Sequence, residues 1–479
     1  MKHGYLTVYL SLSLALLLSL ILTLVEGARI STIRMEAECV ADIGMNSVLA
    51  EFHRELLEQY DLLFVDMSYG TASPSIERSQ GHLREYMQKN FTVGERGIIS
   101  SRDWLSLSVD RSTISEYSIA SDENGDVMRQ QVLKYMKEST VEGVLSEVVG
   151  QVMENISLLE EVGLNSRNIE GERNDIQAQI DAIELPKEEK EEEVVEISLD
   201  NPADKVNAYR GIGILRLLLK DTSSLSEEVI NADNYISHRS TKKGTGLHPD
   251  VKRSQGLTDR LLFDSYLFEK CSRYGNTLDK SLLKYQIEYI LEGKESDSDN
   301  LEKVAKRLLL WREVANVIYI LSDSAKCAQA RALALTLTAV LQVPALVEPV
   351  KYSILFAWAY IESLSDVRCL LDGGKIPIMK TSADWKTDID SVEDFGGSIP
   401  ENEGRGRGLS YEDYLRIMLF LQADNIKNMR TMDIMEMDIR KTPGNIYFRM
   451  DACFDSFFAE IGVSSEFGYC MDIQKRYGY

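Results

Sequence analysis

An uncharged stretch near the start of the chain limits the possible folds more than any other feature. Tyr5 to Val25 is a run of 21 residues without a charge or a proline. At about 1.5 Å per helical residue, such a run covers the roughly 30 Å of a bilayer's hydrocarbon core. A cleaved secretory signal is the alternative, but its apolar run is usually about 7–15 residues long and ends at an A-x-A-like site. Here the run leads into Glu26 and Arg29 without such a site, which predicts a retained transmembrane anchor over residues 1–28.

The charges beside this anchor leave its orientation open. Lys2 precedes the uncharged run, and Arg29 and Arg34 follow it. Positively charged residues are enriched on the cytoplasmic side of a span. Because both flanks carry such residues, the rule does not decide the orientation here.

Small residues recur every fourth position along the anchor. Such a row lets two helices approach closely in lipid, and hydroxyl groups can bond across the contact. Four residues advance a helix by about 400°, so only two or three steps face one partner. The row predicts membrane lipid and other transmembrane helices as neighbours, although chance in a serine- and leucine-rich span is the alternative. Its members are Thr7, Ser11, Ala15, Ser19, Thr23 and Gly27.

The helical pattern continues beyond the anchor. Apolar or small residues separated mainly by threes and fours form one face of a helix, and proline is absent until Pro74. The pattern predicts a stalk helix over residues 29–65, so that one helix from Tyr5 to Phe64 is about 90 Å long. The stripe consists of Ile30, Ile33, Ala37, Val40, Gly44, Val48, Phe52, Leu56 and Leu63.

The rest of the chain predicts an α+β fold that is predominantly helical. Stretches near 98–120 and 446–479 are rich in β-branched and aromatic residues and predict a small antiparallel sheet, with two strands expected within 98–120. Residues 66–123 and 441–479 form the mixed part of a head, and 124–440 form a large helical insertion. The insertion contains an acidic linker, 184–200, expected to be mobile because like charges repel, and a polar loop, 237–256. Two apolar segments, 328–343 and 352–364, are too short to span a bilayer, which favours a buried hairpin over one that lies in the membrane.

No reaction is predicted by the composition or the motifs. The formal net charge is −23, which disfavours nucleic acid as a partner. The chain has six cysteines, none in a C-x-x-C pair. Cys453 and Cys470 are the closest two and are a possible disulfide, with free thiols as the alternative. Neither a nucleotide fingerprint nor a metal-ligand pattern is present, so we expect no catalytic residues, no cofactor and no metal.

The opening Gly4–Leu12, GYLTVYLSL, resembles the N-terminus of TadE-like proteins of the tight-adherence pilus system. Further stretches resemble an uncharacterised Gram-positive family associated with such loci. They are residues 26–29 (EGAR), 50–64 (AEFHRELLEQYDLLF), 373–377 (GGKIP) and 409–415 (LSYEDYL).

The resemblance implies a non-catalytic, pilin-like component or assembly factor of a surface pilus or secretion machine. It implies a single-pass protein of the cell membrane with a cytoplasmic N-terminus and an extracellular head. It also implies possible processing between Gly4 and Tyr5, although Tyr9 stands where type IV pilins usually carry glutamate. A membrane-anchored extracellular binding or sensory scaffold and a membrane-tethered enzyme are the alternatives.

Overall fold

The chain forms two compact units, each built from separate parts of the sequence. Unit 1 comprises residues 1–138, 233–255 and 431–479, and unit 2 comprises 139–232 and 256–430. The computed structural model describes residues 2–91, 105–139, 142–163, 167–184, 187–190, 193–196, 199–211, 213–219, 221–223, 225–245, 256–400, 402 and 408–479.

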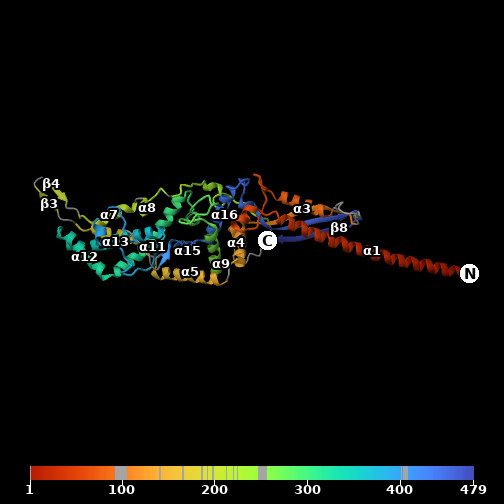
Figure 1. Ribbon diagram of the computed structural model, residues 1–479, viewed down its shortest axis with the longest axis horizontal. Coiled ribbons are helices and arrows are strands. Elements are labelled where there is room, and N and C mark those ends of the chain that lie inside the picture. The colour runs from red at the N-terminus through yellow and green to blue at the C-terminus, as the bar shows by residue number, and fades with distance from the viewer. Residues whose placement is uncertain are drawn as a thin grey trace. The chain divides into compact units, whose positions relative to one another are not determined.

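Unit 1 combines a very long first helix with an antiparallel sheet (Figure 1). Strand β7 is central: it pairs with β2 along its whole length and, on its other side, with β8 and the short β1. The elements are α1 (Lys2–Leu49), α2 (Arg54–Tyr60), β1 (Val65–Asp66), α3 (Ile76–Phe91), β2 (Leu107–Ile119), α4 (Asp122–Ser139), η4 (Met450–Ala452), β7 (Cys453–Ser465) and β8 (Cys470–Gly478). The tail therefore pairs with the earlier strand as predicted, which confirms the α+β class.

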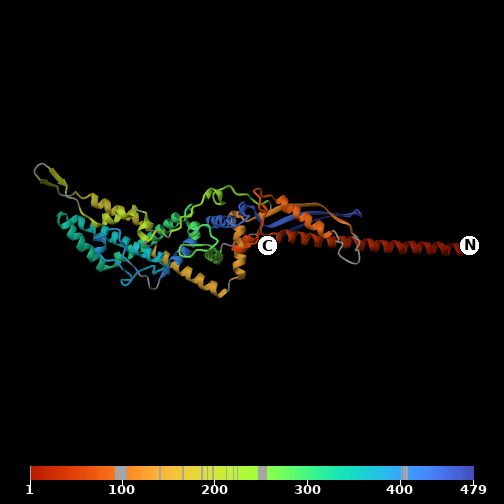
Figure 2. The same ribbon diagram turned by 45° about the horizontal axis from the view of Figure 1, so that its top comes forward.

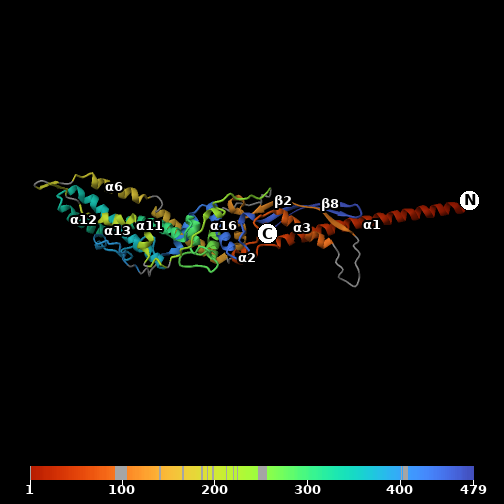
Figure 3. The same ribbon diagram turned by 90° about the horizontal axis from the view of Figure 1, so that it is seen from above.

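Helix α1 has two different halves. Its second half packs on α3 and on the sheet, and the residues buried in this core are Ile33, Ala37, Val40, Ala41, Met45, Val48 and Leu49. Their spacing follows the apolar stripe that the sequence displays. The first half extends beyond the sheet and lies clear of it in all three views (Figure 1, Figure 2 and Figure 3).

The predicted stalk helix, 29–65, is wrong at its end, because α1 stops at Leu49. A new helix then begins, since the Nδ1 atom of His53 accepts a hydrogen bond from the Leu56 backbone and caps α2. Asp61 adopts a left-handed conformation and ends α2 after two turns. Leu56 is buried as the stripe predicts. The spacing of apolar residues therefore predicts burial correctly here, but it does not reveal that one helix ends and another begins.

Gly44 lies where α1 packs closely against α3. A Cβ atom at this position would lie 2.7 Å from Met87 Cγ and 3.2 Å from Leu83 Cδ1. Gly44→Leu is therefore expected to lower the free energy of unfolding by about 1–3 kcal/mol, the usual cost of overpacking a core. Gly27→Leu is the matched control on the same helix, since nothing lies within 4 Å of its Cβ position. Equal denaturation midpoints for the two variants would contradict this account of the contact.

Unit 2 is almost entirely helical. Its elements are α5 (Glu142–Val162), α6 (Ile169–Asp181), β3 (Lys187–Lys190), β4 (Glu193–Glu196), α7 (Pro202–Ala208), η1 (Tyr209–Gly211), α8 (Ile214–Leu218), α9 (Leu257–Lys270), α10 (Gln286–Glu292), α11 (Asp297–Ser322), α12 (Ser324–Ala339), η3 (Pro344–Leu346), α13 (Val347–Leu371), β5 (Lys375–Ile376), α14 (Asp390–Glu393), β6 (Leu409–Ser410) and α15 (Tyr411–Leu421). Helices η2 (Ala232–Asn234) and α16 (Asp424–Arg440) cross the boundary between the units.

The centre of unit 2 is α13, which packs against α11, α12 and α6. Nearly every residue from Ser353 to Leu371 is buried. A helix that is apolar on all sides belongs inside a protein core or a membrane. Here surrounding helices cover it, which explains why a segment that resembles a short membrane span is instead an internal helix.

Three further differences separate the structure from the expectations. The acidic linker, 184–200, contains an antiparallel ribbon of β3 and β4 instead of a wholly irregular loop. Only one strand, β2, occupies the described part of 98–120, and residues 98–104 lie outside the described residues. Unit 2 is smaller than the predicted insertion, 124–440, because nearly all of α4, residues 233–255 and the second half of α16 belong to unit 1.

Candidate functional sites: the free half of α1 and a buried ion cluster

The first half of α1 is an exposed apolar surface. Within the described residues, α1 is the one helix long and apolar enough to cross a membrane, and none of its most apolar window is buried. Its leucines, from Leu6 to Leu24, are each more than half exposed. A fully exposed leucine forgoes about 1.5–3 kcal/mol of burial free energy, so this surface is energetically unfavourable in water.

The six residues predicted for helix packing all lie exposed on this half. Ser11 Oγ donates a hydrogen bond to the Val8 carbonyl at 2.9 Å, and Thr23 Oγ1 donates to the Ser19 carbonyl at 2.7 Å. Hydroxyl groups bonded in this way are satisfied within their own helix. The predicted processing residues, Gly4 and Tyr5, lie in the first turn of α1.

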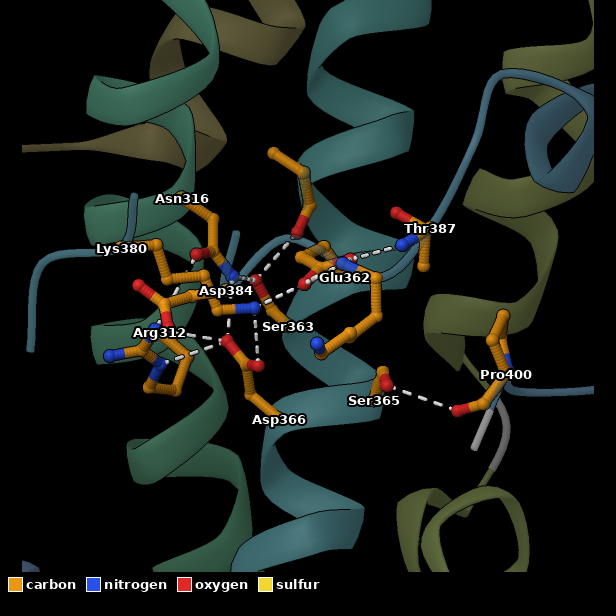
Figure 4. Close-up of polar contacts among 12 residues, drawn as sticks. Arg312, Asn316, Glu362, Ser363, Ser365, Asp366, Lys380, Asp384, Thr387 and Pro400 are labelled. Carbon is orange, nitrogen blue, oxygen red and sulfur yellow. Dashed lines mark hydrogen bonds and ion pairs between the residues drawn. The ribbon is translucent and has the colours of Figure 1, made fainter. Parts of the chain in front are cut away.

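A second candidate is a cluster of charged side chains inside unit 2 (Figure 4). The guanidinium of Arg312, on α11, donates twice to Asp366 Oδ2, at 3.1 and 3.0 Å. Lys380, in the segment after α13, forms ion pairs with Glu362 and, at 2.6 Å, with Asp366 Oδ1. All four side chains are at most 1% exposed, so two cations and two carboxylates balance one another's charge inside the core.

Neighbouring polar groups complete the cluster. Asn316 donates to Asp366 at 3.0 Å and to Ser363 at 2.9 Å. The Glu362 carboxylate accepts hydrogen bonds from the backbone N–H groups of Lys386 and Thr387. Burial alone would lower the pKa of Arg312, but the attraction of nearby Tyr414 and Asp366 outweighs it and holds this pKa above its ordinary value.

Two of the sequence stretches that carry the family resemblance meet at Arg312. The GGKIP stretch contains β5, and the LSYEDYL stretch begins with β6, which pairs with it. Arg312 Nη1 donates to the carbonyls of Pro377 and Ile378 at 2.8 and 2.9 Å, and to Tyr414 Oη at 3.2 Å. The resemblance is therefore carried in part by residues that organise the interior of unit 2.

The chemistry of the cluster is structural. A catalytic acid or base must come within hydrogen-bond reach of a substrate, whereas these groups are enclosed and bonded to one another. Across the described parts of both units, no group of three or more His, Cys, Asp or Glu side chains is arranged to hold a metal ion. We therefore assign to the cluster the role of holding α11, α13 and residues 377–387 together.

Unit 1 has a more exposed polar cluster just after α1. Glu51 accepts hydrogen bonds from Tyr69 Oη at 2.7 Å and Tyr86 Oη at 2.5 Å, and lies 2.9 Å from His82 Nδ1. The hydrogen bond to Glu51, together with burial, raises the pKa of Tyr86 to about 12, so this phenol stays protonated as a donor. Through Glu51, these contacts hold α3 and Tyr69 against the segment that follows the end of α1.

The possible disulfide between Cys453 and Cys470 is wrong, since both thiols are free. The strand register explains this: Cys470 lies opposite Ser464, whereas Cys453 lies opposite Asp66 near the start of β7. Eleven residues of strand separate those positions, or about 35 Å at 3.3 Å per residue, against the roughly 7 Å limit for bridged Cα atoms. Burial raises the pKa of the Cys453 thiol well above its ordinary value, which keeps it protonated and inert.

Together, the fold and these sites define an α+β protein with an exposed apolar helix and a tightly bonded helical core. A family of unknown function, DUF5702, matches residues 188–465. This is more than half of the chain, and the chain belongs to that family. The match includes all four residues of the ion cluster and β7, whereas α1 lies outside it. No curated protein and no solved structure matches the chain.

Proposed function

We propose that this protein is a membrane-anchored, non-catalytic, pilin-like (TadE-like) minor component or assembly factor of a bacterial surface pilus or secretion machine. The supporting observation is the division of α1. Its first half is apolar and exposed, and its second half packs on an antiparallel sheet. A continuous helix of this kind connects the folded head rigidly to the lipid or protein that contacts the apolar half.

The proposed neighbours of the apolar half are membrane lipid and transmembrane helices of the same assembly. Leucine side chains can contact lipid on any face of the helix, whereas the row of small residues allows the backbone of another helix to approach closely. A filament or secretion machine supplies many such helices within one membrane. The acidic composition, with a net charge of −23, is expected to disfavour anionic lipid surfaces and nucleic acid as partners of the folded units.

Crosslinking through the membrane tests the packing role. A photoreactive group at Ala15 is expected to join α1 to neighbouring helices in intact cells. Ser19→Leu with Thr23→Leu should abolish those products, because the branched side chains prevent close approach. Ser13→Leu is the matched control, since two residues from Ala15 is about 200° around the helix. Unchanged products in the Ser19 and Thr23 variant would contradict the packing role.

The proposed orientation places the N-terminus in the cytoplasm and both folded units outside the cell. Protease added to whole cells is then expected to digest the parts of both units outside the membrane and leave a short fragment that contains the first half of α1. The mass of that fragment also decides whether the mature chain begins at Met1 or, after processing behind Gly4, at Tyr5. Full protection of the units in intact cells, with cleavage after lysis, would contradict this orientation.

A further inference from the structure

The turn between β7 and β8 lies beside the position where the uncharged run of α1 ends. This turn, Ser465–Tyr469, is called the tip turn below. Tyr469 Oη donates a hydrogen bond to the Glu26 carboxylate, and Glu26 directly follows Val25, the last residue of the uncharged run. The Arg29 guanidinium lies over the Phe467 ring, 4.3 Å from its centroid. Both aromatic side chains of the turn are thus held at the level of residues 26–29.

The tip turn has a fixed conformation. Ser465 N donates to the Tyr469 carbonyl at 2.8 Å, and Gly468 N donates to the Ser465 carbonyl at 2.9 Å. Ser465 Oγ donates to the Leu105 carbonyl at 2.6 Å. Gly468 adopts a φ of +83°, a conformation that glycine reaches without steric cost. Nevertheless Phe467, at the apex, keeps 47% of its surface exposed, so this rigid turn presents an aromatic ring to its surroundings.

The position of the tip turn along the axis of α1 is set by contacts at both ends and in the middle of β8. Besides the Tyr469–Glu26 contact, Lys475 pairs with Asp42 at 2.6 Å, and Tyr479 Oη donates to the Leu49 carbonyl. From residue 26 to 49, α1 rises about 35 Å, and from 469 to 479 a strand covers about 34 Å. Because residues 26–49 of α1 and residues 469–479 have nearly the same length, β8 lies extended beside the second half of α1 and is held at both ends. The tip turn therefore cannot move along the helix.

We propose that the tip turn is a membrane-interface contact, in which Phe467 and Tyr469 enter the lipid headgroup layer around α1. The proposal rests on α1 being the membrane anchor, as the proposed function requires. Tyrosine favours the interface because its apolar ring can enter the acyl boundary while its hydroxyl group stays hydrated. Phenylalanine adds an apolar ring that can be buried at the same boundary. Arg29, beside Phe467, is then placed to reach lipid phosphates. The turn fixes how deeply α1 sits and keeps the sheet at the bilayer surface.

Tryptophan quenching in reconstituted membranes tests the proposal on the full-length protein. Phe467→Trp reports on the tip turn, and Leu16→Trp reports on the middle of the uncharged run. Tyr447→Trp is the matched control, because Tyr447 is a similarly exposed aromatic of unit 1, 50% exposed, and neighbouring Asn445 bonds to His53, beyond the far end of α1. Each variant is placed in phosphatidylcholine vesicles whose bromine atoms lie either near the headgroups or near the bilayer centre. Emission is compared with that of the parent protein, and thermal unfolding midpoints verify that each variant is folded.

We expect the added emission of Phe467→Trp to be quenched most by bromines near the headgroups, and that of Leu16→Trp by bromines near the centre. Tyr447→Trp should be unaffected by either. Quenching at Leu16 without quenching at Phe467 would overturn the interface contact and leave the anchor in place. No quenching at either position would overturn both the anchor and the contact. Equal quenching at Phe467 and Tyr447 would also overturn it, since the contact would then not be specific to the tip turn.

Discussion

Asp366→Asn is expected to be the most destabilising conservative substitution in unit 2, lowering the free energy of unfolding by about 3–5 kcal/mol. The variant preserves the shape of the side chain but removes one of the two carboxylates of the cluster. Arg312 and Lys380 would then share Glu362 as their only anionic partner within it. A buried positive charge without compensation costs several kcal/mol because its lost hydration is not replaced. Trp358 and Trp385 lie next to the cluster, so tryptophan emission during urea unfolding measures the effect.

Glu348→Gln is the matched control for this experiment. Glu348 is on the same helix, α13, and its side chain, which pairs with Lys351 at 2.5 Å and with Arg331 at 3.7 Å, is 50% exposed. An exposed pair contributes about 0–1 kcal/mol, so the control should unfold close to the parent. If Asp366→Asn is as stable as Glu348→Gln, the cluster does not hold unit 2 together.

Stability of unit 2 is expected to fall as the pH rises from about 4.5 to 7, by an amount on the order of 3 kcal/mol, through Glu288. Glu288 is fully buried, and burial raises its pKa to about 7. One carboxyl oxygen, Oε1, accepts hydrogen bonds from Tyr411 Oη at 2.9 Å and from the Tyr274 backbone at 3.1 Å. In this pH range the folded protein keeps a proton that the unfolded chain releases. Raising the pH therefore favours the unfolded state, and the loss levels off above the folded pKa.

Glu288→Gln supplies the comparison, because an amide of nearly the same shape has no proton to release. The difference in unfolding free energy between parent and variant, followed by urea denaturation across this pH range, isolates the contribution of Glu288. Other buried acids cancel in this difference, including Asp455, whose pKa burial raises to about 6. Parallel stability profiles for the two proteins would show that Glu288 does not titrate as described.

Local patterns predicted the elements of this fold better than their ends. The uncharged run and the following stripe predict α1 because helix periodicity needs only nearby residues. The same stripe continues through Leu56, although the helix ends at Leu49. The reason is that Leu56 is buried from a second helix, α2, which begins at a cap formed by His53. The spacing of apolar residues does not reveal this change of helix. The β-prone tail was predicted to pair with the earlier strand region, since aromatic and β-branched residues mark both.

The candidate sites were less accessible to sequence reasoning because they depend on residues far apart in the chain. Arg312 and Asp366 are 54 positions apart, and no local spacing relates them. One signal was present: Glu362 and Asp366 lie one helical turn apart in the mainly apolar, buried part of α13. Buried carboxylates at such positions need cations, but the sequence does not specify which of the chain's lysines and arginines supply them. The tip turn was missed for the same reason, because only the pairing of β7 with β8 brings Phe467 beside Arg29.

Fractionation of cells that express the full-length protein tests the membrane anchor most directly. Membranes are washed with high salt and with alkaline carbonate, and then dissolved in detergent. Because leucines of the first half of α1 are expected to contact lipid, the intact chain should remain in the membrane pellet through both washes and appear in solution only with detergent. Release of the intact chain by salt or carbonate alone would contradict the account.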